Sequence, residues 1–421
     1  MTSPLLSWSI VAAATAGVIT RPFKWPEAVW AVSGAILLVS LRLLPVELAF
    51  KAVGEGMDVY LFLVGMMLLS EVGRREGLFD WVAGIAVNRS RGSPRKLFLL
   101  VYLVGIVITA FLSNDAAAVV LTPAVFAAAK KAKMPPLPLL FICAFIANAA
   151  SFALPISNPA NLVLYGNHTP ALSKWLMRFA LPSALSIGAT YALLRWTQRD
   201  ALAGVCEADL EPPKLSVSGR VALAGLGVTA LALLTVSAFD IRLGLPTAIL
   251  GVLTATVVLT QERQSPLPMI RGMSWSVLPL VAALFVLVEA LAHTGVITAL
   301  ARLLQRMTQQ GLLATAASAG GIVAIASNLT NNLPAGLIAS QTVVQAHIPE
   351  RVIDALLIGV DLGPNLSITG SLATILWLNA IRREGEDVRF LTFLKVGAVV
   401  MLPTLVLALL ARICVGPVAN S

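Results

Sequence analysis

Long apolar stretches separated by short polar segments dominate the pattern of this chain. The stretches at residues 28–44, 223–239, 276–292 and 396–410 contain almost no charged residues. A helix needs about 20 apolar residues to cross the core of a bilayer, within a range of about 17 to 25. These stretches lie at the short end of that range, and they lack the polar–apolar alternation of a membrane-spanning β-strand. The pattern predicts an all-α polytopic membrane protein in which some helices are broken.

The same landmarks occur twice along the chain, in the same order. In each half an apolar segment ends at a glutamate. A glycine lies six residues after this glutamate, and a polar pair begins 42 or 43 residues after it. The matching landmarks are Glu71 with Glu289, Gly77 with Gly295, Asn114-Asp115 with Asn331-Asn332, and Ile156-Ser157-Asn158-Pro159 with Ile368-Thr369-Gly370-Ser371. Agreement at four places over more than a hundred residues indicates an internal repeat.

Each half is expected to contain five spanning helices and one re-entrant hairpin. In the first half we expect spans at about 4–20, 25–44, 57–73, 137–165 and 174–195, with a hairpin at about 97–130. In the second half we expect spans at about 219–239, 243–260, 275–300, 351–380 and 390–414, with a hairpin at about 311–346. Because five is odd, the halves would have opposite orientations, the inverted-repeat plan of many secondary transporters.

The chain accordingly divides into a first inverted repeat at 1–198, a cytoplasmic linker at 199–218 and a second inverted repeat at 219–421. The segment from Arg74 to Ser90 is too polar to span and is expected to lie on the inner surface as an amphipathic helix. We interpret residues 5–19 as a first helix, because no basic region precedes them and no cleavage site follows.

Charge supports this plan and excludes a soluble nucleic-acid-binding protein. Only 12% of residues are charged, against about 25% in soluble domains. The net charge is +9, and with both termini outside most of the 30 Lys and Arg residues lie in predicted cytoplasmic loops. This is the bias that the positive-inside rule requires. We therefore expect the inner membrane of a bacterium, with the first hairpin entering from the cytoplasm and the second from outside.

Four polar clusters interrupt the apolar stretches, two in each half, at residues 113–115, 157–161, 328–334 and 361–374. Polar residues and helix breakers are costly inside a bilayer unless they line a cavity. Polar contacts between helices are the structural alternative. The predicted substrate-binding residues are Asn114, Ser157, Asn158, Asn161, Asn331, Asn332, Thr369, Ser371 and Thr374.

Asp115 is the one carboxylate within the two predicted hairpin tips. Because burial disfavours the charged form of a carboxylate, such a group can take up and release a proton. We predict that Asp115 couples transport to protons, with Asp361 as a second candidate and an ion-paired structural acid as the alternative for Asp115. The sequence predicts no catalytic residues, no metal site and no cofactor. The three cysteines are scattered, and no phosphate-binding loop for ATP is present.

At these clusters the chain resembles the arsenical pump membrane protein family, the arsenite efflux permeases of the ion transporter superfamily. The similarity lies in the segments SNDAAAVVLTP at 113–123, SNPAN at 157–161, NNLP at 331–334 and DLGPNLSITGSLATILW at 361–377. The resemblance implies export of arsenite and antimonite in exchange for protons, in some members with a separate ATPase subunit.

The chain departs from that family where Asn365 replaces a common Lys, where Asn148 stands in place of an expected acid, and where Pro-Ala replaces a more usual Leu-Val within 157–161. Arsenite is mainly the uncharged trihydroxide at neutral pH, and the clusters offer it hydroxyl and amide partners without Arg or Lys. Two alternatives from the same superfamily remain: a sodium/proton antiporter and a sodium-coupled dicarboxylate carrier. An intramembrane enzyme is disfavoured, because paired catalytic carboxylates and hydrolase motifs are absent.

Overall fold

The structure is a computed structural model that describes residues 3–166, 169–207, 214–239 and 241–415, and these contain helices and no strand. The predicted all-α class is therefore confirmed. Both chain ends, and part of the expected linker at 199–218, lie outside the described residues.

The first half of the chain contains eleven numbered helices. They are α1 (Ser3–Thr20), α2 (Glu27–Ser40), α3 (Val46–Glu55), α4 (Met57–Arg75), α5 (Leu78–Ser90), α6 (Pro94–Phe111), α7 (Asn114–Ala116), α8 (Thr122–Lys131), α9 (Leu137–Ala149), α10 (Pro159–Tyr165) and α11 (Leu172–Thr197). A π-helical turn at Ala117–Leu121 joins α7 to α8, so that these three segments form one helical arm.

The second half contains ten. They are α12 (Val217–Ala238), α13 (Gly244–Glu262), α14 (Leu267–Gly272), α15 (Val277–His293), α16 (Val296–Gln310), α17 (Leu312–Thr330), α18 (Asn332–Ala346), α19 (Glu350–Leu362), α20 (Leu372–Arg383) and α21 (Phe390–Cys414).

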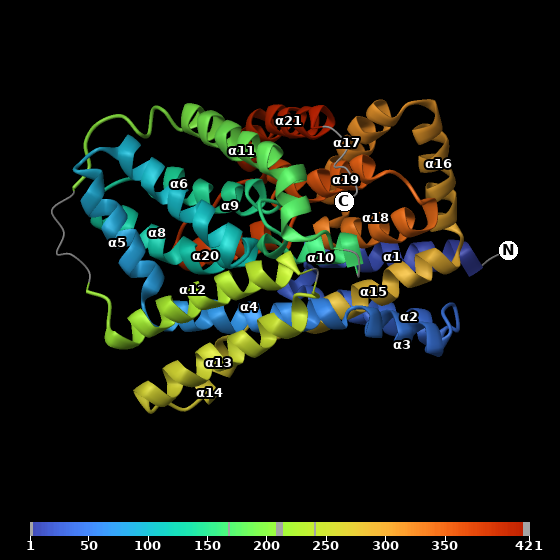
Figure 1. The fold of residues 1–421 in the computed structure, drawn as a ribbon, viewed down its shortest axis with the longest axis horizontal. Helices are drawn as coiled ribbons and strands as arrows, with labels where there is room; N and C mark the ends of the chain where they lie inside the picture. Colours follow the sequence, from blue (N-terminus) through green and yellow to red (C-terminus); the bar gives the residue numbers. More distant parts are fainter. Residues whose placement is uncertain (1–2, 167–168, 208–213, 240, 416–421) are drawn as a thin grey trace.

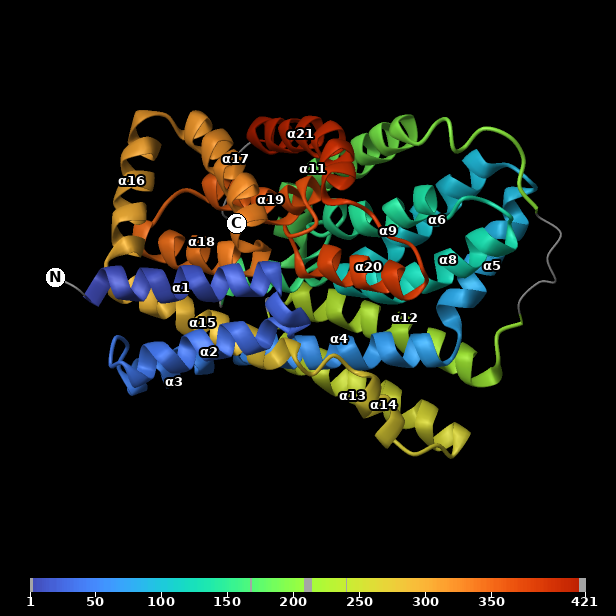
Figure 2. The same cartoon turned by 180° about the vertical axis from the view of Figure 1, so that it is seen from behind.

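The helices pack as two bodies, each with members from both halves of the chain. In the first body α4 packs along α13, and α2 packs against α1 and α15. In the second body α17 packs along α19, α11 along α21 and α6 against α9. Figures 1 and 2 show α11 and α21 along one flank and α12 to α14 along the opposite flank, with α5 and α16 at opposite ends of the long axis.

Five helices, α6, α12, α13, α17 and α21, are each long and apolar enough to cross a membrane. The bent pairs α3–α4 and α15–α16 would bring this number to seven among the described residues. Ten spans were predicted, and the difference arises partly because breaks divide two expected spans into the shorter pairs α9–α10 and α19–α20. The re-entrant geometry of α6–α8 and α17–α18 stays a prediction.

The two landmark glycines have the same backbone conformation. Gly77 begins α5 with φ +68°, and Gly295 begins α16 with φ +87°, a left-handed conformation that glycine adopts without steric cost. The expected span at 275–300 is therefore wrong at its end, because the chain bends by 74° here and continues as α16. The short helix α3 was also not predicted; Pro45 precedes it, and a bend of 47° separates it from α4.

Backbones touch where the long helices of the first body cross. A Cβ added to Gly65 on α4 would lie 2.3 Å from the carbonyl oxygen of Thr247 on α13. A Cβ added to Gly251 would lie 2.7 Å from the carbonyl oxygen of Gly65. Close approach through small residues is how helices associate in membranes, where the hydrophobic effect does not drive them together.

Replacing Gly65 with alanine is expected to destabilise the protein by about 1–3 kcal/mol, because the added methyl group forces α4 and α13 apart. Gly227 on α12 is the matched control, since a Cβ there meets nothing within 4 Å. Thermal unfolding of the full chain in detergent measures both. Equal unfolding midpoints for Gly65→Ala and Gly227→Ala would contradict the close packing of α4 on α13.

Candidate functional site

Four helices begin in the middle of the fold, and each has a polar side chain at its first turn. Each of these side chains accepts a hydrogen bond from a backbone N–H of the first turn: Ser113 from Ala116 (3.4 Å), Asn158 from Ala160 (3.0 Å), Asn331 from Leu333 (3.4 Å) and Ser371 from Thr374 (3.1 Å). Backbone N–H groups at a helix start have no partner within the helix. These side chains supply acceptors that water would otherwise provide, so the breaks are stable in an apolar surrounding.

The two hairpin turns share an unusual backbone. Ser113 has φ +141° and Asn331 has φ +76°, both in the region that favours glycine. Such strain persists only where the surrounding structure enforces it, and it is concentrated at functional sites. Ser113 and Asn331 are both N-caps, of α7 and α18, so they occupy equivalent positions. The alignment of the two halves that was inferred from the sequence is therefore shifted here by one residue. Leu333, and not Asn332, is then the counterpart of Asp115.

The helix breaks meet at a small central cavity of about 10 Å³, on the order of the space that one water molecule needs. Residues from both turns and from the starts of α10 and α20 line it, together with one residue each from α4 and α15. The lining residues are Leu63, Asn114, Asp115, Asn158, Pro159, Val277, Asn332, Leu333 and Leu372. Its polar groups are therefore three amides and one carboxylate, and no Lys or Arg is among these described residues.

A larger vestibule of about 540 Å³ adjoins this cavity and shares Leu63, Asp115, Pro159 and Val277 with it. Asp115 lines both spaces, so this half-buried residue lies on the boundary between them. Four charged residues also line the vestibule: Glu71, Arg74, Arg383 and Glu384. Glu71 is buried and paired with Arg74 (2.6 Å) and Arg75 (2.8 Å).

Hydrogen bonds join the breaks of the first half to those of the second. The Asn158 side-chain amide donates to Asp361 Oδ1 at 2.8 Å. The pair Asn148 and Asn365, at 3.1 Å, joins α9 to the segment after α19. Within the second half, the backbone N–H of Asn332 donates to the carbonyl oxygen of Gly370 at 2.9 Å and joins the start of α18 to the segment before α20. The cavity thus lies between segments from the two halves of the chain.

Six of the nine predicted binding residues do not line the cavity, and the side chains of five of them hold backbone groups. Ser157 donates to Ala110 O (3.0 Å), Asn161 to Ser151 O (2.9 Å), Thr369 to Asn328 O (3.1 Å) and Thr374 to Ile368 O (2.8 Å), while Ser371 caps α20. Asn331 lies at a separate small cavity beside Glu27. The structure therefore brings together Asn114, Asp115, Asn158 and Asn332 from the predicted set.

Four buried side-chain oxygens near the centre have no hydrogen-bond partner among the described residues. They are Asn148 Oδ1, Asn161 Oδ1, Asn332 Oδ1 and Asp361 Oδ2. Asp361 is fully buried and does not line the cavity; Asn158, which does, lies between. Because buried polar groups are nearly always paired in native proteins, these atoms mark places for a ligand, a proton or water.

A buried network of ion pairs joins α10, α11, α19 and α21, and it was not predicted from the sequence. Asp354 is fully buried and bonds to Arg412 (2.6 Å), to Arg178 (3.7 Å) and to the Tyr165 hydroxyl, and Arg178 also pairs with Glu350. The signal was available, because ionisable residues inside predicted spans are rare and are functional candidates by default. The network links helices from both halves of the chain within the second body.

Replacing Asp354 with asparagine is expected to destabilise the protein by about 3–5 kcal/mol, because two buried arginines lose their shared counter-charge. Glu350→Gln is the matched control: Glu350 also pairs with Arg178, but its side chain is 52% exposed, and an exposed pair contributes about 1 kcal/mol or less. Thermal unfolding in detergent compares them. Similar decreases in stability for the two variants would contradict the conclusion that the buried Asp354 carboxylate stabilises both arginines.

Comparisons with known proteins agree with this architecture. Residues 15–363 match the citrate transporter family, CitMHS. The chain is 26% identical to the arsenical pump membrane proteins of Yersinia enterocolitica, over 83% of this chain and 84% of that protein, and of Escherichia coli K12, over the same shares. An uncharacterized transporter of Mycobacterium tuberculosis is 26% identical over 90% of this chain and 91% of its own length.

A solved structure shares the fold. The YdaH transporter of Alcanivorax borkumensis, whose crystal structure is described as having an unusual topology, superposes with a TM-score of 0.55 at 17% identity. The match covers 98% of this chain and 97% of that one. The resemblance to arsenical pump membrane proteins predicted from the sequence is confirmed, and the chain is a multi-pass membrane transporter that belongs to the CitMHS citrate transporter family of the ion transporter superfamily.

Proposed function

We propose that this transporter exports arsenite and antimonite, as neutral trihydroxides, from a bacterial cytoplasm in exchange for protons by alternating access. The observation that carries the proposal is the lining of the central cavity. It combines amides from both repeats with one carboxylate and has no cationic residue among those described. The names of the relatives in Yersinia and Escherichia support the same substrate class.

The chemistry of the substrate fits these groups. A trihydroxide has three O–H donors and lone pairs on each oxygen, and a side-chain amide offers both an acceptor oxygen and an N–H₂ donor. Asn114, Asn158 and Asn332 present amides from three different helix starts. In this structure the cavity holds about one water, so we propose that substrate enters from the vestibule and that the helix breaks separate around it.

Asp115 is proposed to carry the proton. Its carboxylate touches both the cavity and the vestibule, so one small movement changes which space it contacts. A protonated Asp115 would offer an O–H group to an incoming hydroxyl oxygen, and an ionised one would accept from it. Asp361, bonded to Asn158, is the second proposed proton site, and the unpaired Asp361 Oδ2 is where the proton would reside.

The vestibule is proposed to open to the cytoplasm. Arg74, Arg383 and the basic ends of α6, α8 and α11 belong to loops that the positive-inside rule assigns to that side. The chain termini, which lie outside the described residues, would then be external.

A sodium-coupled carrier of citrate or a dicarboxylate is the second candidate, and the description of the matched family favours it. An organic di- or trianion needs cationic partners or bound cations in the site. The cavity offers neither Lys nor Arg among the residues described, so this candidate requires sodium ions to complete the site.

Arsenite flux in proteoliposomes that contain only this chain is expected to follow an imposed pH gradient without sodium or ATP. In Asp115→Asn, gradient-driven flux is expected to fall to the level of protein-free vesicles, because the amide cannot release a proton. Asp387→Asn is the matched control, since Asp387 pairs with Arg382 on the surface, away from the cavity.

Three results would contradict this. Unchanged gradient-driven flux in Asp115→Asn would remove Asp115 from coupling. Sodium-dependent citrate uptake without arsenite flux would favour the second candidate. Flux that appears only with an added ATPase subunit and ATP would overturn proton exchange by this chain alone.

The orientation has its own test with a membrane-impermeant maleimide. In a background with Cys206 and Cys414 replaced by serine, Ser274→Cys in the vestibule is expected to react only in inverted vesicles. Ser173→Cys, at the start of α11 at the opposite end of the spanning direction, is expected to react only in right-side-out vesicles. The reverse pattern would show that the vestibule opens to the outside.

A further inference from the structure

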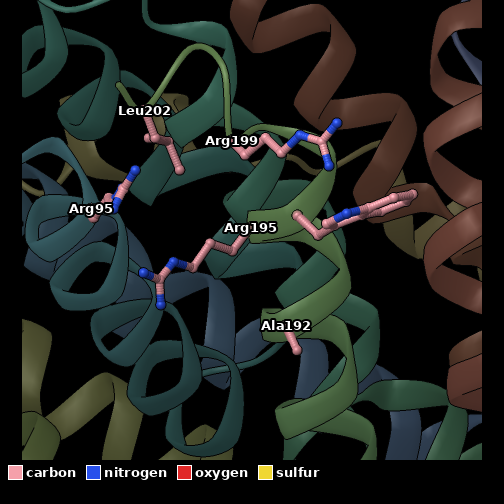
Figure 3. Close-up of a pocket in the computed structure, with 6 residues that line it drawn as sticks. Arg95, Ala192, Arg195, Arg199 and Leu202 are labelled. Atoms are coloured by element: carbon pink, nitrogen blue, oxygen red, sulfur yellow. The ribbon is translucent and has the colours of Figure 1, made fainter. Parts of the chain in front are cut away.

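A second pocket, unrelated to the transport site, lies at the surface between the start of α6 and the end of α11. Its volume is about 260 Å³. Six residues line it: Arg95, Ala192, Arg195, Trp196, Arg199 and Leu202. Figure 3 shows Arg95 on α6 and Arg195 on α11 at one side of this space, whereas the side chain of Arg199, in the turn after α11, points away from them. Leu202 is buried and forms an apolar wall.

The positive charge of the pocket is almost unbalanced. Arg199 has one distant carboxylate neighbour, Asp200 at 3.7 Å, whose side chain is 96% exposed. Arg195 donates a long hydrogen bond of 3.5 Å to the Tyr191 hydroxyl. Arg95 has no ion pair within the part of the chain that the structure describes. Arg95 and Arg195 thus line one pocket without an acidic partner among the described residues, and such a pair of guanidinium groups is typical of an anion site.

An apolar surface leads away from the arginines along both helices. On α6, Leu99, Leu103 and Val107 follow one another at one-turn spacing and are exposed. On α11, Leu185 and Leu181 do the same. In a membrane protein such rows face lipid tails. Figures 1 and 2 place both helices in the second body.

Close to the pocket, a hydrogen bond and an aromatic contact join the two helices. The Tyr102 hydroxyl on α6 donates to the carbonyl oxygen of Ile187 on α11 at 2.7 Å. The rings of Tyr102 and Tyr191 lie 5.1 Å apart. Beside them Trp196 is 55% exposed, and the Arg199 guanidinium lies over its ring at 5.5 Å. An exposed Trp beside cations at the end of an apolar helix is typical of the headgroup level.

We propose that this pocket binds the phosphate-bearing headgroup of an anionic phospholipid, with an acyl chain along the exposed apolar residues of α6 and α11. Guanidinium groups bind phosphate oxygens in pairs, and basic pockets between spanning helices are known sites for anionic headgroups. The proposal holds whichever way the protein is oriented and whatever it transports. A lipid bound there would bridge α6 and α11, which both belong to the second body.

The test uses the full chain in detergent, titrated with phosphatidylglycerol and followed by native mass spectrometry and thermal unfolding. Phosphatidylcholine of the same chain length and inorganic phosphate are separate arms. We expect phosphatidylglycerol alone to bind and to raise the unfolding midpoint. In Arg95→Gln/Arg195→Gln the affinity is expected to fall about five-fold for each charge removed.

Two further variants distinguish binding at this pocket from a general effect of positive charge. Arg302→Gln/Arg306→Gln on α16 removes the same charge from exposed arginines at the other end of the molecule and is expected to bind as the unchanged protein does. Arg95→Lys/Arg195→Lys keeps the charge and is expected to retain most of the affinity. An equal loss in the α16 variant, equal binding of phosphatidylcholine, or full competition by inorganic phosphate would each overturn a headgroup site.

Discussion

The structure depends on one constraint: a helix that stops in an apolar surrounding must find partners for its freed backbone groups. Four breaks meet at the centre of this fold, and each is capped by Ser or Asn. Ser157, Asn161 and Thr374 hold further carbonyl oxygens. Most of the polar residues that make the centre possible are therefore occupied by the backbone, and few polar atoms remain to contact a ligand.

The remaining atoms lie where segments from the two halves of the chain meet. Asn158 bonds to Asp361 in the other half, and within the second half the Asn332 backbone bonds to Gly370. Asn148 and Asn365, the two positions where the chain departs from an acid and a lysine expected of arsenical pump proteins, contact each other at 3.1 Å. Because both side chains are neutral amides, neither leaves an unpaired charge at the centre. Among the described residues, the cavity lining and its hydrogen-bonded neighbours accordingly include the carboxylates of Asp115 and Asp361 and no Lys or Arg.

Much of the fold follows from pattern. The helices α6–α8 and α17–α18 begin and end within a few residues of the limits predicted for the two hairpins, because prolines, glycines and polar clusters interrupt an otherwise apolar sequence. The shared Glu-to-Gly spacing was interpreted only as a mark of the repeat. It did not predict the turn at Gly295, and a span was expected to continue through it. The bend that makes α16 a separate helix depends on a left-handed glycine, which apolar content alone does not reveal.

The sequence by itself determined the class of the protein and the four clusters that form its centre, because hydropathy and helix breakers are properties of short segments. Only the tertiary structure decided which members of those clusters line a cavity. Asn114, Asn158 and Asn332 do, whereas Ser157 and Asn161 do not, although all five were predicted substrate-binding residues. The direction of a side chain depends on the helix that it caps and on the neighbour across the repeat interface. Those neighbours are about two hundred residues away along the chain, and no local pattern records them.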